Sequence, residues 1–147
     1  MAIWTYLLFA LLAGAMLPLQ FGINAQLAEW VGGSVRAAFV SFLVGAVALL
    51  LAALTTVRDG WPDRAGNGPW WIWIGGLLGA FYVLGSIVTA PKLGAATLVA
   101  LILAGQATAS LLVDHFGWVG FEQHPITGLR VVGVLFLAGG VALVRLS

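Results

Sequence analysis

The sequence predicts an all-α protein embedded in a membrane, built as a bundle of five transmembrane helices. Of its 147 residues, 62% are hydrophobic and only 7% are charged, whereas an ordinary soluble domain is about 25% charged. The mean hydropathy is +1.09. Five apolar stretches approach or exceed the roughly 20 residues that a spanning helix needs. We expect them to form a single transmembrane domain over residues 1–147.

Charge and cysteine content exclude several classes of protein. The net charge of +1 comes without a basic cluster that could grip phosphates, so no nucleic acid partner is expected. The absence of cysteine excludes disulfides and thiolate metal sites. The N-terminus lacks the basic region and the small-residue cleavage pattern of a signal peptide, so we expect the first apolar stretch to be retained. No cofactor is predicted.

The first span, residues 3–24, is uncharged but contains a proline and two amides. Pro18 removes one backbone hydrogen bond and should kink the helix, which makes it a candidate hinge. Gln20 and Asn24 are four residues apart and therefore share a helix face. In lipid such amides face a protein interior or a wet cavity. They either line a solute pathway or join helices by hydrogen bonds, and the nearby proline favours the pathway.

The second span, residues 35–57, follows a short polar turn at Glu29–Ser34. It carries a stripe of small residues, which is typical of a helix that packs closely against a neighbour. The segment Arg58–Pro69 combines glycine, proline and alternating charge, and is interpreted as a solvated connector.

The third span, residues 70–90, opens with Trp70, Trp71 and Trp73. Indole rings prefer the headgroup level of a bilayer, so these residues are expected to mark the membrane surface. A stacking site for an aromatic or cationic substrate is the alternative. Deeper in the span, Tyr82 and Ser86 lie four residues apart on one face and are candidate substrate contacts.

The fourth span, residues 95–113, carries a polar line that leads toward water. Gln106, Ser110 and Asp114 recur at intervals of four residues. Because the first span carries a similar amide pattern, we expect Gln106 and Ser110 to share a cavity with Gln20 and Asn24. Packing by hydrogen bonds between helices remains the alternative.

The loop after the fourth span holds the remaining titratable candidates. Asp114 and His115 form a candidate proton-linked pair, and a plain solvated loop is the alternative. The histidines lack the spacing of a metal site, so no metal is predicted. The fifth span, residues 128–144, is bracketed by Arg130 and Arg145, which are interpreted as anchors at the membrane surface.

The basic residues are distributed evenly between the two sides of the membrane. With the N-terminus inside, the inner side holds Arg58, Arg64 and Arg130, and the outer side holds Arg36, Lys92 and Arg145. Basic residues normally set orientation by their excess on the inner side. An even distribution favours insertion in both orientations. Two opposite copies would form an antiparallel homodimer of ten helices, with the inverted-repeat symmetry that alternating access uses.

Several short motifs together resemble the YdcZ-like group of the drug/metabolite transporter superfamily. They are Pro18-Leu19-Gln20 with Asn24–Leu27, Ser41–Gly45, Trp70-Trp71 with Gly75, Gly76 and Gly79, Gly105-Gln106, and Asp114–Gly117. The resemblance covers nearly the whole chain. It implies a multi-pass protein of the bacterial inner membrane, a five-helix half of a ten-helix transporter of exporter type. The related small multidrug exporters are similar in logic but carry a glutamate in their first helix, and this chain has no carboxylate there.

The function predicted from these features is transport of a small molecule, as an exporter that works by alternating access through a polar, uncharged site. The alternative is a structural or regulatory membrane subunit that transports nothing. An enzyme is not expected, because no nucleophile or acid–base pair lies at one depth in the spans.

Overall fold

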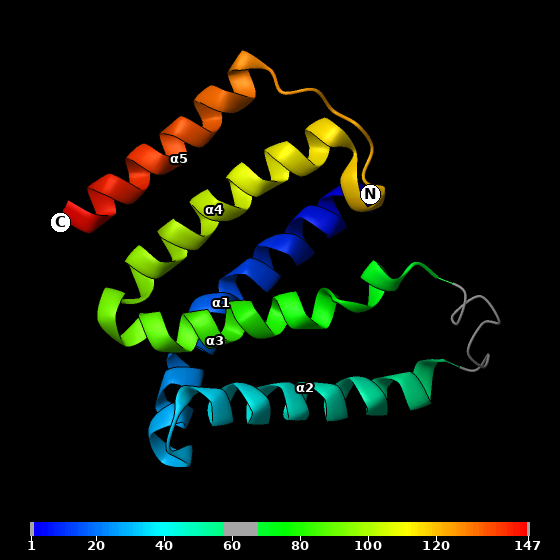
Figure 1. Ribbon diagram of the computed structural model, residues 1–147, viewed down its shortest axis with the longest axis vertical. Coiled ribbons are helices and arrows are strands. Elements are labelled where there is room, and N and C mark those ends of the chain that lie inside the picture. Colours follow the sequence, from blue (N-terminus) through cyan, green and yellow to red (C-terminus); the bar gives the residue numbers. More distant parts are fainter. Residues whose placement is uncertain (1, 58–67, 147) are drawn as a thin grey trace. The chain divides into compact units, whose positions relative to one another are not determined.

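The computed structural model describes residues 2–57 and 68–146, and every regular element in these two ranges is helical (Figure 1). Five helices are long and apolar enough to cross a membrane, which confirms the predicted class and the five spans. The predicted connector at Arg58–Pro69 lies largely outside the described residues, because these leave out 58–67.

The chain forms two compact units. The elements are α1 (Ala2–Val31), α2 (Ser34–Thr56), the 3₁₀ helix η2 (Trp70–Trp73), α3 (Gly75–Leu93), α4 (Ala95–Phe116), the 3₁₀ helix η3 (Trp118–Gly120) and α5 (Gly128–Leu146). The middle unit comprises Leu19–Lys92. The terminal unit comprises the residues up to Pro18 and those from Leu93 onward. The boundary within α1 therefore falls directly after Pro18.

Helix α1 extends seven residues beyond the predicted end of the first span, so the expected polar turn is helical up to Val31. Two glycines stop it. Gly32 and Gly33 have φ angles of 76° and 144°, which side chains disfavour. The Gly33 N–H donates to the Ala28 carbonyl at 2.8 Å, the six-to-one hydrogen bond of a Schellman motif. The length of the helix is thus set by its capping residues rather than by the end of the apolar stretch.

The core of the middle unit lies where the end of α1 meets the start of α2 and the second half of α3. Its buried members are Ala37, Ala38, Val83 and Ile87, and the partly buried residues packed against them are Leu27, Ala28, Val31, Tyr82 and Leu84. The small side chains of α2 allow close approach of the helices. Further along, the Phe42 ring lies 3.5 Å from the position of a β-carbon at Gly79. Helices α2 and α3 therefore lie side by side in antiparallel directions (Figure 1).

The third span differs from the expected helix at both ends. Trp70–Trp73 form η2, and the α-helix proper starts at Gly75. At the other end α3 continues past the expected stop near Ala90 and includes Pro91 in its last turn. Proline is tolerated there because only one carbonyl, that of Ile87, loses its helical donor.

The terminal unit contains the hairpin of α4 and α5, which pack against each other in antiparallel directions (Figure 1). Helix α4 ends at Phe116 and is capped by Gly117, which adopts a φ angle of 63° and donates its N–H to the Val113 carbonyl. The following η3 contains a second left-handed residue, Val119, with φ 51° and ψ 30°. An extended segment then leads to α5.

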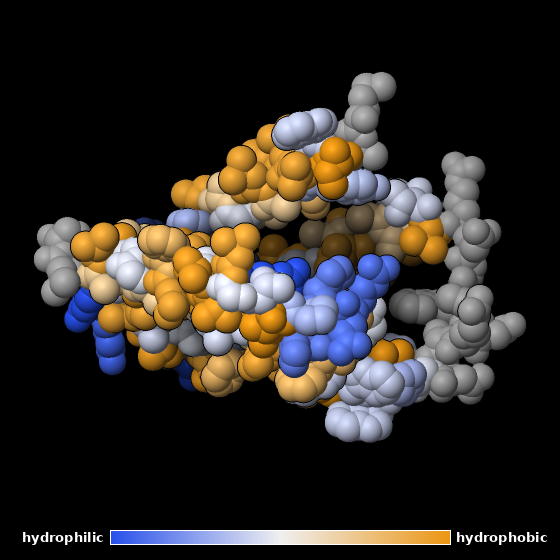
Figure 2. Space-filling model, turned by 90° about the horizontal axis from the view of Figure 1, so that it is seen from above, coloured by the Kyte–Doolittle hydropathy of each residue, from blue (hydrophilic) through white to orange (hydrophobic). Residues whose placement is uncertain are grey.

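The helices expose most of their apolar residues. Hydrophobic side chains dominate the face drawn in Figure 2. No residue in the most apolar stretch of α5 is buried, and only 6% of the corresponding stretches of α1 and α2 are. Lipid or another protein must therefore cover these faces.

Candidate functional site

The predicted site residues fall in both units. Gln20, Asn24, Tyr82 and Ser86 belong to the middle unit, whereas Gln106, Ser110, Asp114 and His115 belong to the terminal unit. The candidate hinge Pro18 is the last residue of the terminal unit before the boundary. The cavity expected to join the amides of the first and fourth spans stays a prediction.

Asn24 is the most distinctive polar residue of the middle unit. Its side chain is only 4% exposed, and its Nδ2 atom has no hydrogen-bond partner. Leaving a buried amide donor unpaired costs about 1–3 kcal/mol. Gln20, which the sequence analysis grouped with Asn24, is exposed. The two amides therefore experience different surroundings, although they are four residues apart.

Phe21, one turn before Asn24 in α1, packs against Tyr82 of α3. Phe21 is buried, and the two ring centroids lie 6.1 Å apart at an interplanar angle of 59°. The Tyr82 hydroxyl is also buried without a hydrogen-bond partner. The middle unit thus contains two polar groups, those of Asn24 and Tyr82, that remain available to a ligand, an ordered water or a partner chain.

Ser86 differs from these two groups. Its side chain is buried, and its hydroxyl donates to the Val83 carbonyl one turn earlier at 2.8 Å. Because this bond lies within α3, the hydroxyl needs no other partner. It keeps acceptor capacity on its oxygen for a second contact.

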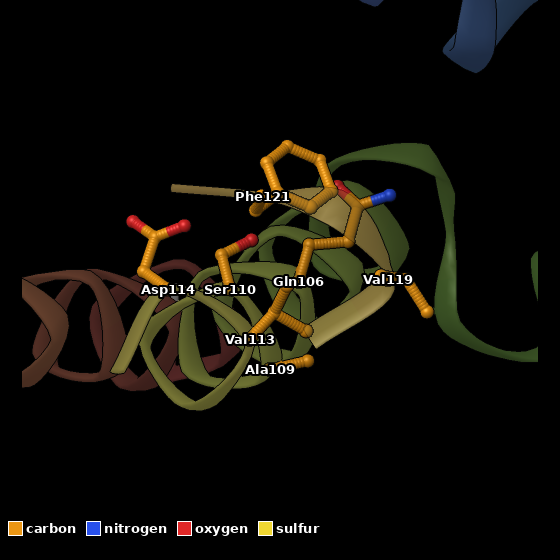
Figure 3. A pocket seen from close by; sticks show the side chains of 7 residues that line it. All are labelled: Gln106, Ala109, Ser110, Val113, Asp114, Val119 and Phe121. Carbon is orange, nitrogen blue, oxygen red and sulfur yellow. The ribbon is translucent and has the colours of Figure 1, made fainter. Parts of the chain in front are cut away.

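A pocket of about 290 Å³ opens in the terminal unit, along one face of α4 (Figure 3). It is lined by Gln106, Ala109, Ser110, Val113, Asp114, Val119 and Phe121. The polar side chains of Gln106, Ser110 and Asp114 project from the same side of the helix as the Phe121 ring (Figure 3). The four-residue spacing seen in the sequence thus brings these three side chains into one lining.

The Asp114 carboxylate has a partner at the start of α5. Its Oδ2 atom lies 3.2 Å from Nη1 of Arg130, in an ion pair whose side chains are 31% and 37% exposed. The same Nη1 donates to the His124 carbonyl at 3.5 Å. The His124 N–H in turn donates to the Asp114 carbonyl at 2.7 Å. Arg130, interpreted from sequence only as a membrane-surface anchor, therefore also ties α5 to the end of α4.

His115 is held by the same loop. Its Nδ1 atom accepts a hydrogen bond from the Ile126 N–H at 3.2 Å. Its carbonyl accepts one from Nε2 of Gln123 at 3.0 Å. The hydrogen bond from the Ile126 N–H requires that Nδ1 of His115 carry no proton. Both members of the candidate proton-linked pair, Asp114 and His115, therefore accept hydrogen bonds. Their proposed role in proton coupling stays a prediction.

Sequence reasoning missed two features of this region, the Arg130 ion pair and the strained Val119. A β-branched residue with positive φ is a genuine backbone outlier. The neighbouring Gly117 and Gly120, which also have positive φ, are the only signal in the sequence that this loop turns sharply. Within the described ranges, no three His, Cys, Asp or Glu side chains come together as a metal centre.

Comparison with known proteins gives the family. Residues 5–143 match the family described as "Putative inner membrane exporter, YdcZ". The chain is 29% identical to the "Inner membrane protein YdcZ" of Escherichia coli (strain K12) over 144 residues, which cover 96% of this chain and 95% of that protein. No solved structure matches the chain. The family description names a transport class rather than an enzyme class. The chain therefore belongs to the YdcZ family and is a multi-pass protein of the bacterial inner membrane.

Proposed function

We propose that this protein exports a small molecule by alternating access, as an antiparallel homodimer in which each copy contributes a polar, uncharged site. The observation that carries the proposal is the buried, unpartnered amide of Asn24. Polar groups inside a membrane protein are expensive, and they are usually retained for function. A solute that hydrogen-bonds to this amide and to the Tyr82 hydroxyl would supply both missing partners. Gln20 and Ser86 complete the proposed lining in the middle unit, and Gln106 and Ser110 provide a separate polar group on the proposed solute route in the terminal unit.

Pro18 supports a moving first helix. Helix α1 is continuous through this position, but proline leaves the carbonyl four residues earlier, at Gly14, without its helical donor. The boundary between the two units falls directly after Pro18. A helix that lacks one backbone hydrogen bond can bend at that position at a low cost in free energy. Alternating access by a rocking motion around a central site requires such a bend.

The even charge distribution and the exposed apolar faces support the antiparallel pair. Three basic residues lie on each predicted side of the membrane, so neither orientation is favoured. A single copy leaves no residue in the most apolar stretch of α5 fully buried. A second, inverted copy would cover part of this surface and would generate the symmetry of two inverted repeats.

Cysteine labelling tests the orientation directly, because the protein has no cysteine of its own. We would compare Glu29→Cys, at the end of α1, with Glu122→Cys, in the loop between α4 and α5, since both residues are exposed. In intact cells, a membrane-impermeant thiol reagent should label about half of each population and all of it after permeabilisation, as a three-to-three charge balance predicts. Labelling of only one of the two variants would mean a single orientation and would overturn the antiparallel homodimer.

A transport assay tests the site. Proteoliposomes would be screened with labelled neutral, zwitterionic and cationic solutes, and an active solute would then be used to compare variants. Asn24→Ala should abolish transport, whereas Gln26→Ala should not, because Gln26 is an exposed amide on the same helix. Transport that survives Asn24→Ala would make the amide a packing element. Absence of all flux together with stable co-purification of another membrane protein would support the alternative, a structural or regulatory subunit.

A further inference from the structure

We infer that the pocket on α4 binds a small organic cation, which competes with Arg130 for the Asp114 carboxylate. The inference deepens the proposed function and rests on it in one respect, because Gln106 and Ser110 belong both to this pocket and to the proposed solute route. The pocket itself lies entirely within the terminal unit and involves no residue of the middle unit.

The chemistry of the lining selects a positive charge. Asp114 supplies a carboxylate, and the Ser110 hydroxyl and the Gln106 carboxamide oxygen supply acceptors on the same helix face. No Lys or Arg lines the pocket itself. Phe121 presents an aromatic ring on the same side (Figure 3), and a cation within about 6 Å of a ring centroid is attracted to its face.

The apolar part of the lining limits the ligand to a compact, partly apolar cation. Ala109, Val113 and Val119 offer no hydrogen bond. A volume of about 290 Å³ accommodates a substituted ammonium group with a short side arm. An amine or quaternary ammonium compound of this size would place its charge at Asp114 and its carbon atoms against these three residues.

A ligand cation can displace the Arg130 guanidinium from the Asp114 carboxylate. Its contact with Asp114 is a single nitrogen–oxygen approach of 3.2 Å rather than a bidentate pair, and both side chains are about one third exposed. The same nitrogen already reaches a second acceptor, the His124 carbonyl, at 3.5 Å. When a ligand cation takes the carboxylate, Arg130 can move to this carbonyl instead of losing every partner. The ion pair therefore acts as an internal competitor for the site.

The strained backbone at Val119 points to the same pocket independently. A β-branched residue in the left-handed region costs stability, and such strain clusters where a binding site requires it. Val119 lines the pocket and has a φ of 51°. Its conformation allows the chain to turn between the end of α4 and Phe121, so the aromatic ring lies beside the carboxylate face.

Choline and its neutral isostere test the inference. Radiolabelled choline would be added to the purified full-length protein in phosphatidylglycerol nanodiscs, with empty nanodiscs as the background. Unlabelled choline should displace the label, whereas 3,3-dimethylbutan-1-ol, which has the same shape without the charge, should not. Equal displacement by the alcohol, or no saturable binding of choline, would overturn the inference.

Asp114→Asn and Arg130→Gln should change choline binding in opposite directions if Arg130 competes with the ligand, and in the same direction if the ion pair only builds the pocket. Asp114→Asn should weaken choline binding by at least about tenfold, because the ligand charge loses its partner. Arg130→Gln should strengthen it severalfold, because the competitor is removed. Phe121→Leu should weaken it about two- to fivefold through loss of the ring. Weaker binding by Arg130→Gln, in a variant that elutes and melts like the native protein, would show that the ion pair builds the pocket and would contradict the inference.

Matched controls keep the test decisive. Glu122→Gln removes a neighbouring exposed carboxylate outside the pocket and should leave binding unchanged, as should Arg145→Gln. If Arg130→Gln does not fold, Arg130→Ala replaces it with the same expectation, and equal losses in Asp114→Asn and Glu122→Gln would still overturn the inference. Nanodiscs containing phosphatidylethanolamine should bind choline equally well. A fall in binding there would assign the pocket to a lipid headgroup amine rather than to a soluble cation.

The proposed function and this inference fail in different ways. Asn24→Ala should lose transport but bind choline like the native protein, because Asn24 is absent from the pocket. Choline binding without any transport would retain the cation site and reject the exporter. Transport that does not depend on Asp114, together with an absence of choline binding, would retain the exporter and reject the cation site.

Discussion

The Asp114 carboxylate and the Arg130 guanidinium meet at 3.2 Å across sixteen residues of the chain, and they join the end of α4 to the first turn of α5. The hydrogen bond from the His124 N–H to the Asp114 carbonyl closes the same loop at 2.7 Å. The loop is thus held by one ion pair, by this backbone hydrogen bond and by the hydrogen bonds of the His115 and Gln123 side chains, and these contributions can be separated experimentally.

The ion pair should contribute little to stability. Because both side chains are about one third exposed, solvent screens the pair, and such pairs are worth about 0.2–1 kcal/mol. A double-mutant cycle with Asp114→Asn and Arg130→Gln, measured by unfolding in detergent, should give a coupling free energy in this range that falls at high salt. A larger coupling, insensitive to salt, would show that the pair is buried in the assembled protein.

Removing the strain at Val119 should stabilise the protein. A left-handed conformation costs a non-glycine residue about 1–2 kcal/mol, so Val119→Gly should raise the midpoint of thermal unfolding although glycine gains freedom in the unfolded state. Val113→Gly, in the regular part of α4, serves as the control and should lower the midpoint. A lower midpoint for Val119→Gly would mean that the packing of the valine side chain outweighs its backbone strain.

The acceptor atom of His115 should matter more than its ring. Asparagine places an oxygen close to the position of Nδ1, so His115→Asn should keep the hydrogen bond from the Ile126 N–H, whereas His115→Leu should lose about 0.5–1.5 kcal/mol of local stability. Amide hydrogen exchange at Ile126 measures this directly. Equal protection in His115→Asn and His115→Leu would argue against the hydrogen bond.

The buried amide of Asn24 should oppose stability. Replacing it with an apolar side chain of similar size, in Asn24→Leu, removes an unsatisfied donor and should stabilise the fold by about 1–3 kcal/mol while abolishing transport. Unfolding in detergent and the proteoliposome assay are the two measurements, and Gln26→Leu, at an exposed position, is the control. A large loss of stability in Asn24→Leu would instead mean that the amide is paired in the assembled protein.

Hydropathy was enough to predict the five spans, because lipid imposes a length and a polarity on each helix that can be counted in the sequence. It was not enough to predict where α1 ends. Seven residues beyond the predicted limit are helical because Glu29 and Trp30 are compatible with a helix and only Gly32-Gly33 stops it. Helix caps follow local backbone chemistry, which an apolar window does not report.

Local periodicity also explains which part of the candidate site could be predicted. Gln106, Ser110 and Asp114 line one pocket because residues four apart on a helix share a face, and this holds in any tertiary structure. The rule does not report burial, since the packing of α1 buries Asn24 and leaves Gln20 exposed although they are also four residues apart. The partner of Asp114 could not be inferred, because a contact across sixteen residues depends on how the loop folds back.

The unequal lengths of the helices make this protein sensitive to bilayer thickness. The 30 residues of α1 correspond to about 45 Å and the 19 residues of α5 to about 28 Å, whereas the hydrocarbon core of a membrane is about 30 Å thick. Helix α5 fits this layer upright, but α1 must tilt, bend or protrude to fit it. Because α1 differs from the thickness of this layer by more than α5 does, the acyl-chain length of the surrounding lipid acts most on the helix that contains Pro18 and Asn24.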